Sequence, residues 1–294
     1  MDFSEVALQF DCQGSTLLGI VAEPLKPAQV AVLVIVGGPQ YRAGSHRQFL
    51  LMSRVLAANG FAVLRFDYRG MGDGEGIQRN FESVSADIGA AIQALQSHMP
   101  VVKRIVLWGL CDGASAALLY WTETRDVRIA GLCLLNPWVR SEASYAKTQV
   151  KHYYTQRLRQ KEFWLKLMSG KVALGALGGF VQKVRASAAA KNGGAPASEP
   201  FQNRMATGWH SFSGPILLIL SEDDYTAKEF IEHADSHPAW NGYQTKGGLT
   251  RRDLIGFDHT FSNAEARKRV EALTLNWLET IVSNRLIEAP PSAN

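Results

Sequence analysis

Apolar residues in this chain come in short continuous runs, separated by segments with helical spacing. The run VAVLVIVGG (30–38) is rich in β-branched residues, as is typical of a strand buried on both faces of a parallel sheet. The segment HRQFLLMSRVLAANGF has helical spacing and reaches Gly60, which suits a helix C-cap. Because this alternation recurs along most of the chain, it predicts an α/β fold with helices on both faces of a parallel sheet.

The pattern predicts eight strands. The first two flank the short polar stretch CQGS, so we expect them to be joined by a tight turn. The expected strands are 5–11, 15–22, 30–36, 62–70, 104–108, 129–137, 215–220 and 251–255, and further helices are expected at 81–97, 112–123 and 263–282.

Residues 139–210 interrupt the alternation with a stretch that is mostly helical, basic and aromatic. We therefore expect one α/β core, formed by 1–138 and 211–294, with 139–210 as a helical cap insertion. Within the cap, the low-complexity stretch ASAAAKNGGAPASEP (186–200) predicts a mobile loop.

The charge of the chain is concentrated in this insertion. Ten lysines and arginines between Lys147 and Lys191 stand against Glu162 alone, whereas the net charge of the whole chain is +4. A solvated basic helix face is the plain interpretation of this segment. The alternative is peripheral contact with an anionic membrane surface or with a phosphate-bearing, lipid-linked carrier. No nucleic-acid-binding motif is present, so we expect no nucleic-acid partner.

Composition and cysteine usage limit the class of protein and predict its location and the state of its thiols. The chain has 294 residues, 46% of them hydrophobic and 20% charged, which excludes disorder throughout. No apolar run reaches the roughly 18 residues of a membrane span, and the N-terminal stretch is acidic where a secretory signal is basic, so we expect a cytoplasmic protein. Its cysteines, Cys12, Cys111 and Cys133, cannot all pair and match no zinc pattern. We expect free thiols, with Cys12 and Cys133 as packing residues, and no metal or cofactor.

The candidate chemistry lies at the expected carboxyl ends of strands, where open α/β sheets carry their active sites. Cys111 stands in Gly-Leu-Cys-Asp-Gly (109–113), the cysteine form of the G-x-S-x-G nucleophile elbow. Asp224 and His259 then follow two later strands, in the order nucleophile, acid, base that this elbow requires. His259 is the expected base and Asp224 the acid that holds its imidazole, with Asp223 left open as a rival.

An oxyanion hole needs two backbone donors near the nucleophile. One is expected from the N–H of Asp112 and the other from Gly38, since Pro39 has no N–H. The side chain of Asp112 is harder to place, because a carboxylate raises the pKa of a nearby thiol. Cys111 would then need His259 or a helix N-terminus to favour its thiolate.

Four other polar residues near these strand ends have open roles. Asp67 and Arg69, in FDYRG, are expected to make structural contacts under the active-site loops. For Arg42 and His46, binding an anionic part of the substrate and a purely structural role are left equally open.

Several stretches carry a family resemblance. VGGPQYRAGSHRQF (36–49), LRFDYRGMGD (64–73), LWGLCDGASAALLY (107–120) and LLILSEDDYTAKEF (217–230) resemble the α/β-hydrolase superfamily and, within it, hydrolase 1 of the exosortase A system. The resemblance runs over about 4–283. It implies an α/β-hydrolase fold and a bacterial setting with exosortase, PEP-CTERM protein sorting and exopolysaccharide synthesis, but it implies no particular substrate. Relatives tend to have glycine and then a variable residue before the aspartate, where this chain has Glu222-Asp223, so the resemblance carries the acid role to Asp224.

These residues favour an enzyme that cleaves or transfers an acyl group. A thiolate at position 111 would attack an ester, thioester or lactone of a small-molecule substrate and form an acyl thioester. Dienelactone hydrolases also carry cysteine in this turn. The alternative from another class is a non-catalytic hydrolase fold that binds a small acyl ligand or a protein partner.

Overall fold

The structure, a computed structural model, describes residues 2–38, 40–140 and 199–288. The chain divides into two compact units, Met1–Val139 with Pro200–Asn294, and Arg140–Glu199. Residues 141–198 lie outside the described residues. They include most of the cap expected at 139–210, its whole basic segment, and all but the last two residues of the mobile loop expected at 186–200. The end of that expected insertion, helix α7 (Phe201–Ser211), belongs to the first unit and packs against helix α3 (Asp112–Thr124).

The first unit is built on an eight-stranded sheet with the order β1-β2-β4-β3-β5-β6-β7-β8. β1 and β2 pair antiparallel and β2 pairs antiparallel with β4, while every other neighbouring pair is parallel. The mostly parallel eight-stranded sheet predicted from the sequence is therefore confirmed. Its strands are β1 (Phe3–Cys12), β2 (Ser15–Pro24), β3 (Val30–Ile35), β4 (Val63–Asp67), β5 (Arg104–Leu110), β6 (Ile129–Leu135), β7 (Ile216–Ser221) and β8 (Leu249–Leu254).

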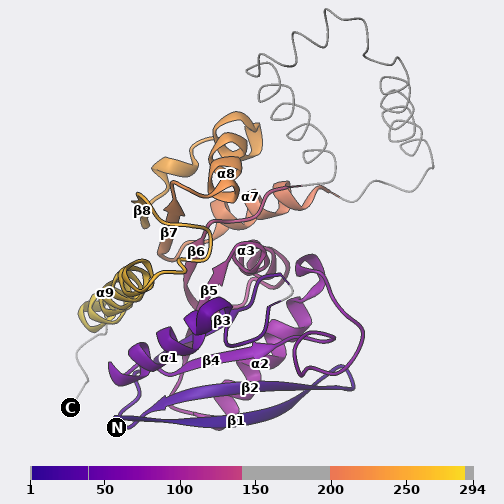
Figure 1. The fold of residues 1–294 in the computed structure, drawn as a ribbon, viewed down its shortest axis with the longest axis vertical. Coiled ribbons are helices and arrows are strands. Elements are labelled where there is room, and N and C mark those ends of the chain that lie inside the picture. Colours follow the sequence, from indigo (N-terminus) through magenta and orange to yellow (C-terminus); the bar gives the residue numbers. More distant parts are fainter. Residues whose placement is uncertain (1, 39, 141–198, 289–294) are drawn as a thin grey trace, which may run out of the picture. The chain divides into compact units, whose positions relative to one another are not determined.

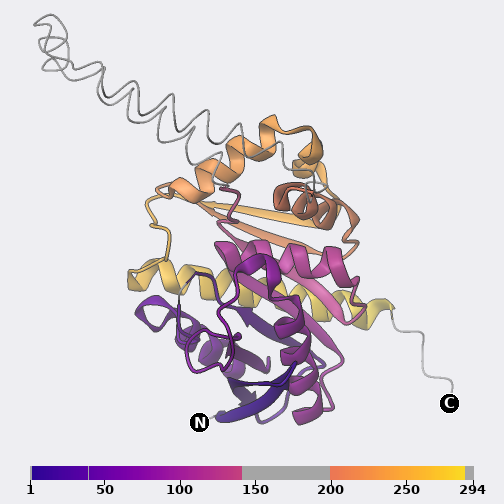
Figure 2. The ribbon, with the colours of Figure 1, turned by 90° about the vertical axis from the view of Figure 1, so that its right-hand side faces the viewer.

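Helices cover both faces of this sheet (Figures 1 and 2). α1 (Gln48–Ala58) packs against α9 (Ala264–Glu288) on one face, and α2 (Ser85–His98) packs against α3 on the other. α8 (Tyr225–Ser236) follows β7. The short 3₁₀ helices are η1 (Ser45–Arg47), η2 (Phe81–Ser83), η4 (Pro238–Trp240) and η5 (Tyr243–Thr245).

Burial follows the position of each strand. Every residue of β3, β4, β6 and β7 is buried, because these inner strands have helices on both faces. β8 forms the edge of the sheet and has one buried residue, Leu254. The strand expected at 251–255 begins two residues earlier, at Leu249, and ends at Leu254. Gly256, with a φ of 76°, then turns the chain into the next loop.

In the part of the chain that the structure describes, no helix combines the length and apolar character needed to cross a membrane. The parallel strands β3, β5, β6, β7 and β8 all have their carboxyl ends on the same side of the sheet. The expected site residues lie in the loops that follow these strands.

Candidate active site

Cys111 occupies a sharp turn between β5 and α3. Its φ of 61° and ψ of −126° lie in a region that side-chain-bearing residues rarely adopt, as the strained elbow requires. A Cβ on Gly109 would lie 2.4 Å from the backbone carbon of Gly113, and one on Gly113 would lie 2.4 Å from the carbonyl oxygen of Ile35. The two glycines of the motif are therefore needed for β3, β5 and α3 to approach one another.

The segment after β6 holds this turn in place. The backbone N–H of Cys111 donates to the carbonyl of Leu135 (2.9 Å), and that of Trp138 donates to the carbonyl of Cys111 (3.2 Å). Ser115 Oγ donates to the carbonyl of Trp138 (2.7 Å). The position of the thiol is thus fixed from both β5 and β6.

The three cysteines differ in environment. Cys12 and Cys133 are buried, and burial raises the pKa of each thiol. Cys111 is only half-buried and stands at the first turn of a helix, whose N-terminal dipole favours a negative charge. Position and exposure both distinguish Cys111 from the other two.

Asp224 and His259 lie against each other beyond the carboxyl ends of β7 and β8. His259 Nδ1 is 2.7 Å from Asp224 Oδ2. Asp224 is buried at the start of α8, where its carboxylate accepts the backbone N–H groups of Thr226 (3.0 Å) and Ala227 (3.3 Å). Asp223 is exposed. Of the two carboxylates that the sequence left open, that of Asp224 contacts the imidazole, so a proton on Nδ1 leaves Nε2 as the basic nitrogen.

Sequence reasoning missed two residues that position His259. Asn136, fully buried and with a φ of 43°, accepts the Ser221 N–H (2.9 Å) and donates from Nδ2 to the carbonyl of His259 (3.3 Å). Ser221 Oγ donates to the carbonyls of Phe257 and Asp258. The available signal was the Asn-Pro pair directly after an apolar run, because asparagine tolerates the left-handed region better than most residues.

Gly38 and Asp112, the expected oxyanion donors, lie side by side. A Cβ on the adjacent Gly37 would come within 2.3 Å of Asp112 Oδ1, so the absence of that atom makes room for the carboxyl group. Burial raises the pKa of the Asp112 carboxyl, while the backbone N–H groups of Gly38 and Gly113 and the nearby His259 act in the opposite direction. A carboxyl group that keeps its proton to higher pH repels a neighbouring thiolate less.

A buried ion pair fixes the loop that carries Gly38. Asp67, at the end of β4, accepts the backbone N–H of Arg42 (2.8 Å) and also pairs with its guanidinium group. Arg42 reaches Asp73 as well (2.8 Å), and Tyr41 donates to that same carboxylate (2.9 Å). Of the two roles left open for Arg42, the structure thus shows a structural contact that ties the 38–44 loop to the 70–76 loop.

The second arginine of this region has its own buried partner. Arg69 pairs with Asp87, with its Nη2 2.8 Å from Oδ2, and its backbone N–H donates to the same carboxylate (2.9 Å). Asp67 and Arg69 therefore both make buried structural contacts below the active-site loops.

A hollow of about 410 Å³ opens beside the elbow. Gly38 and Asp112 line it, and the remaining lining comes from the segment directly after β4, between residues 68 and 81. That volume is within the range of small-molecule binding sites. The remaining lining residues are Tyr68, Met71, Gln78, Arg79, Asn80 and Phe81.

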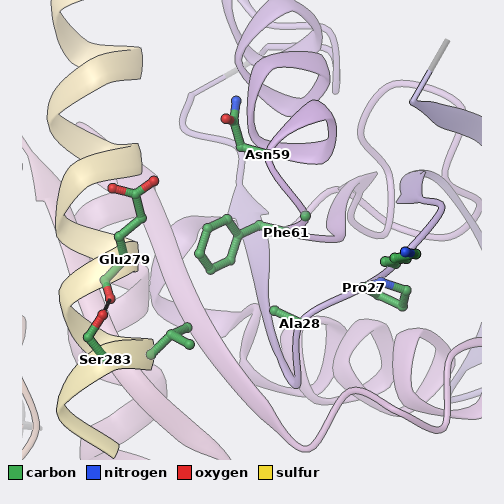
Figure 3. A pocket seen from close by; sticks show the side chains of 9 residues that line it. Pro27, Ala28, Asn59, Phe61, Glu279 and Ser283 are labelled. Atoms are coloured by element: carbon green, nitrogen blue, oxygen red, sulfur yellow. Dashed lines mark hydrogen bonds between the residues drawn. The ribbon is translucent and has the colours of Figure 1, made fainter. Parts of the chain in front are cut away.

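A second hollow, of about 360 Å³, lies elsewhere (Figure 3). Its walls are the chain before β3, the connection between α1 and β4, and the last turns of α9, where Ser283 Oγ donates to the carbonyl of Glu279 (2.8 Å). Since these segments precede β3 and β4, this hollow lies at the amino end of those strands, away from Cys111. The described residues include no group of three or more His, Cys, Asp or Glu side chains arranged to hold a metal ion.

Comparison with known proteins identifies a hydrolase family for this chain. The model of a hydrolase family described as serine aminopeptidase, S33, matches residues 28–185. A comparison of the sequence with curated proteins finds no match.

Solved hydrolases share the fold. The esterase Pf2001 of Pyrococcus furiosus superposes with a TM-score of 0.63 at 16% identity, covering 95% of this chain and 93% of that chain. The α/β hydrolase GrgF from Penicillium gives 0.62 at 16% identity, with 96% and 100% covered. The dienelactone hydrolase of Anabaena variabilis gives 0.59 at 13%, with 95% and 99% covered. The α/β-hydrolase fold predicted from the sequence is confirmed.

Proposed function

Since the chain belongs to the hydrolase family described as serine aminopeptidase, S33, we propose that it cleaves an ester, thioester or lactone through Cys111, His259 and Asp224. The observation that carries this proposal is the hydrogen-bonded Asp224–His259 pair at the sheet edge where Cys111 occupies the elbow. The stability of the fold does not require an acid, a base and a nucleophile at three neighbouring strand ends. Acyl cleavage requires all three, and each has a defined chemical role in it.

The proposed reaction begins at the thiol of Cys111. His259 Nε2 takes the thiol proton, and the sulfur forms a bond to the carbonyl carbon of the substrate. The backbone N–H groups of Gly38 and Asp112, which face the Asp112 carboxyl without substrate, turn to the oxyanion that results and stabilise it. Collapse breaks the bond to the leaving group, an alcohol or thiol that receives the proton from His259, and leaves an acyl thioester on Cys111.

Water then attacks this thioester and His259 takes its proton. The bond between the acyl carbon and sulfur breaks, the carboxylic acid leaves, and His259 returns the proton to the thiol of Cys111. An alcohol, amine or thiol in place of water would give acyl transfer, since a thioester reacts with each of them. The cysteine thus supports transfer as well as hydrolysis, and we keep both within the proposal.

The proposed biological setting comes from sequence motifs. The stretches around the elbow, the Gly38 loop and the acid resemble hydrolase 1 of the exosortase A system, and three cysteines that form no disulfide with one another suit a reducing compartment. We therefore place the enzyme in the bacterial cytoplasm, in support of exopolysaccharide synthesis or exosortase-dependent sorting. A small acyl substrate on an anionic or lipid-linked carrier fits this setting and the basic charge between Lys147 and Lys191.

The proposal is tested by trapping the acyl-enzyme. The protein is mixed with p-nitrophenyl butyrate, a butyryl thioester and a lactone, quenched in acid within seconds, and analysed by intact-mass and peptide mass spectrometry. We expect turnover of at least one substrate and a single acyl adduct on Cys111 that hydroxylamine removes. Turnover without an adduct on Cys111, or adducts spread equally over Cys12 and Cys111, would overturn the proposed nucleophile.

A further inference from the structure

We propose that the hollow beside the elbow is an acyl-binding subsite, and that Arg79 and Asn80 in it select acyl groups that end in a carboxylate. This inference rests on the proposed function, because it takes Gly38 and Asp112 as the place of the reacting carbonyl. It adds the substrate class: half-esters or half-thioesters of short dicarboxylic acids.

The lining of the hollow combines three kinds of group. Gly38 and Asp112 bring the expected oxyanion donors to it. Tyr68, Met71 and Phe81 supply aromatic and apolar surface, and the consecutive residues 78–80 supply polar side chains. An acyl chain with its carbonyl at Gly38 would therefore share the hollow with this apolar stretch and with amide and guanidinium groups.

The walls of the apolar stretch are fixed by packing. Phe81 meets Phe201 of α7 edge to face, with 5.1 Å between ring centres, and Tyr68 meets Phe66 in the same manner at 5.8 Å. Tyr68 and Met71 are almost fully buried. Because these side chains are already held in place, they lose little conformational entropy when a ligand binds.

Arg79 differs from the other arginines near this site. Arg42 and Arg69 are buried and pair with the carboxylates of Asp67 and Asp87. Arg79 is exposed at the hollow and has no ion pair or hydrogen bond with any described residue. Its guanidinium group thus offers several N–H donors in a planar arrangement that matches a carboxylate.

Asn80 contributes a second donor beside Arg79. Its Oδ1 accepts a hydrogen bond from Ser83 Oγ (2.9 Å), which uses the acceptor side of the amide and orients the side chain. The NH₂ group has no acceptor among the described side chains and backbone groups. Two consecutive residues that line the hollow therefore each offer donors to a carboxylate bound there.

The test compares two esters with acyl chains of equal length, p-nitrophenyl pentanoate and mono-p-nitrophenyl glutarate, of which only the second ends in a carboxylate. Because a charge-assisted hydrogen bond is involved, we expect wild-type kcat/KM to be about tenfold higher for the glutarate ester. This preference should shrink as salt is added, since Arg79 is exposed. In Arg79→Gln the ratio of the two kcat/KM values should fall to about one.

Arg252→Gln is the matched control. Arg252 is an exposed arginine on the edge strand β8, outside the hollow, and its Nη1 donates only to the carbonyl of Arg251 among the hydrogen bonds described. We expect this variant to keep both the activity and the preference of the wild type. Equal rates for the two esters in wild type, or an unchanged ratio in Arg79→Gln, would overturn the inference.

A second readout separates this inference from the proposed function. Glutarate itself, which has no leaving group, is tested for its ability to slow the alkylation of Cys111 by iodoacetamide. Protection in wild type and not in Arg79→Gln supports the subsite even where neither ester is hydrolysed, whereas the absence of protection in wild type contradicts it. Failure of the proposed function appears separately, as ester binding without any acyl adduct on Cys111.

Discussion

Replacing Cys111 with alanine is expected to lower kcat/KM for every ester that the protein hydrolyses by about 10⁴-fold or more. The alanine leaves the elbow and the Asp224–His259 pair intact but removes the atom that forms the acyl bond. The residual rate would come from binding and from the oxyanion donors alone. Initial rates with p-nitrophenyl butyrate, followed at 400 nm or thereabouts, give the comparison directly.

Cys12→Ala provides the matched control for this change. Cys12 is a second cysteine, but it is buried and lies at the end of β1. The Cys12→Ala variant tests whether the loss of any cysteine side chain, and not that of Cys111 in particular, lowers the rate of ester hydrolysis. We expect wild-type activity from Cys12→Ala, and a Cys111→Ala protein with more than about a tenth of wild-type activity would show that the thiol is not the nucleophile.

The second large effect is expected from Asp67→Asn, which should lower the free energy of unfolding by about 3 kcal/mol. Asp67 is buried and neutralises the guanidinium group of Arg42, which is also buried. The asparagine keeps the shape of the side chain but leaves that positive charge only its more exposed partner, Asp73. Because the same contacts hold the loop of Gly38, we also expect kcat to fall about tenfold.

Asp73→Asn is the appropriate control, since it removes the other carboxylate of the same arginine. The Asp73 side chain is 54% exposed, and pairs of that kind contribute at most about 1 kcal/mol. Urea unfolding curves of the two variants and the wild type give the two free energies. If Asp67→Asn lowers the free energy of unfolding no more than Asp73→Asn does, the buried Arg42–Asp67 pair does not organise the loop of Gly38.

Much of the fold follows from local patterns that the sequence displays. Continuous apolar runs predicted the inner strands because those strands are buried on both faces. β8 was displaced by about two residues at its start, since an edge strand with a polar, largely exposed sequence has no such run to mark its ends. The end of the expected insertion was also displaced, because a helical pattern alone does not show that α7 packs against α3.

The site could be predicted where a sequence motif determines both the residue types and the backbone conformation. The elbow around Cys111 is such a case, because its glycines are required by close contacts of the backbone. The choice between Asp223 and Asp224 depended on which carboxylate faces His259, which sequence order alone does not determine. The roles of Asn136 and of the Arg42–Asp67 pair depend on contacts between residues far apart in the chain, and no spacing rule reveals these.

The most direct test of the account is the rate of alkylation of Cys111 by iodoacetamide between about pH 5 and pH 9, in wild type and in His259→Ala, with the modified residue identified by mass spectrometry. A thiolate stabilised by a protonated His259 should react rapidly below about pH 7, and the variant should lose that reactivity. Reaction only above about pH 8, unchanged in the variant, would mean that the thiol and the imidazole do not act together. The chain would then be better understood as a hydrolase fold that binds an acyl ligand or a protein partner without catalysis.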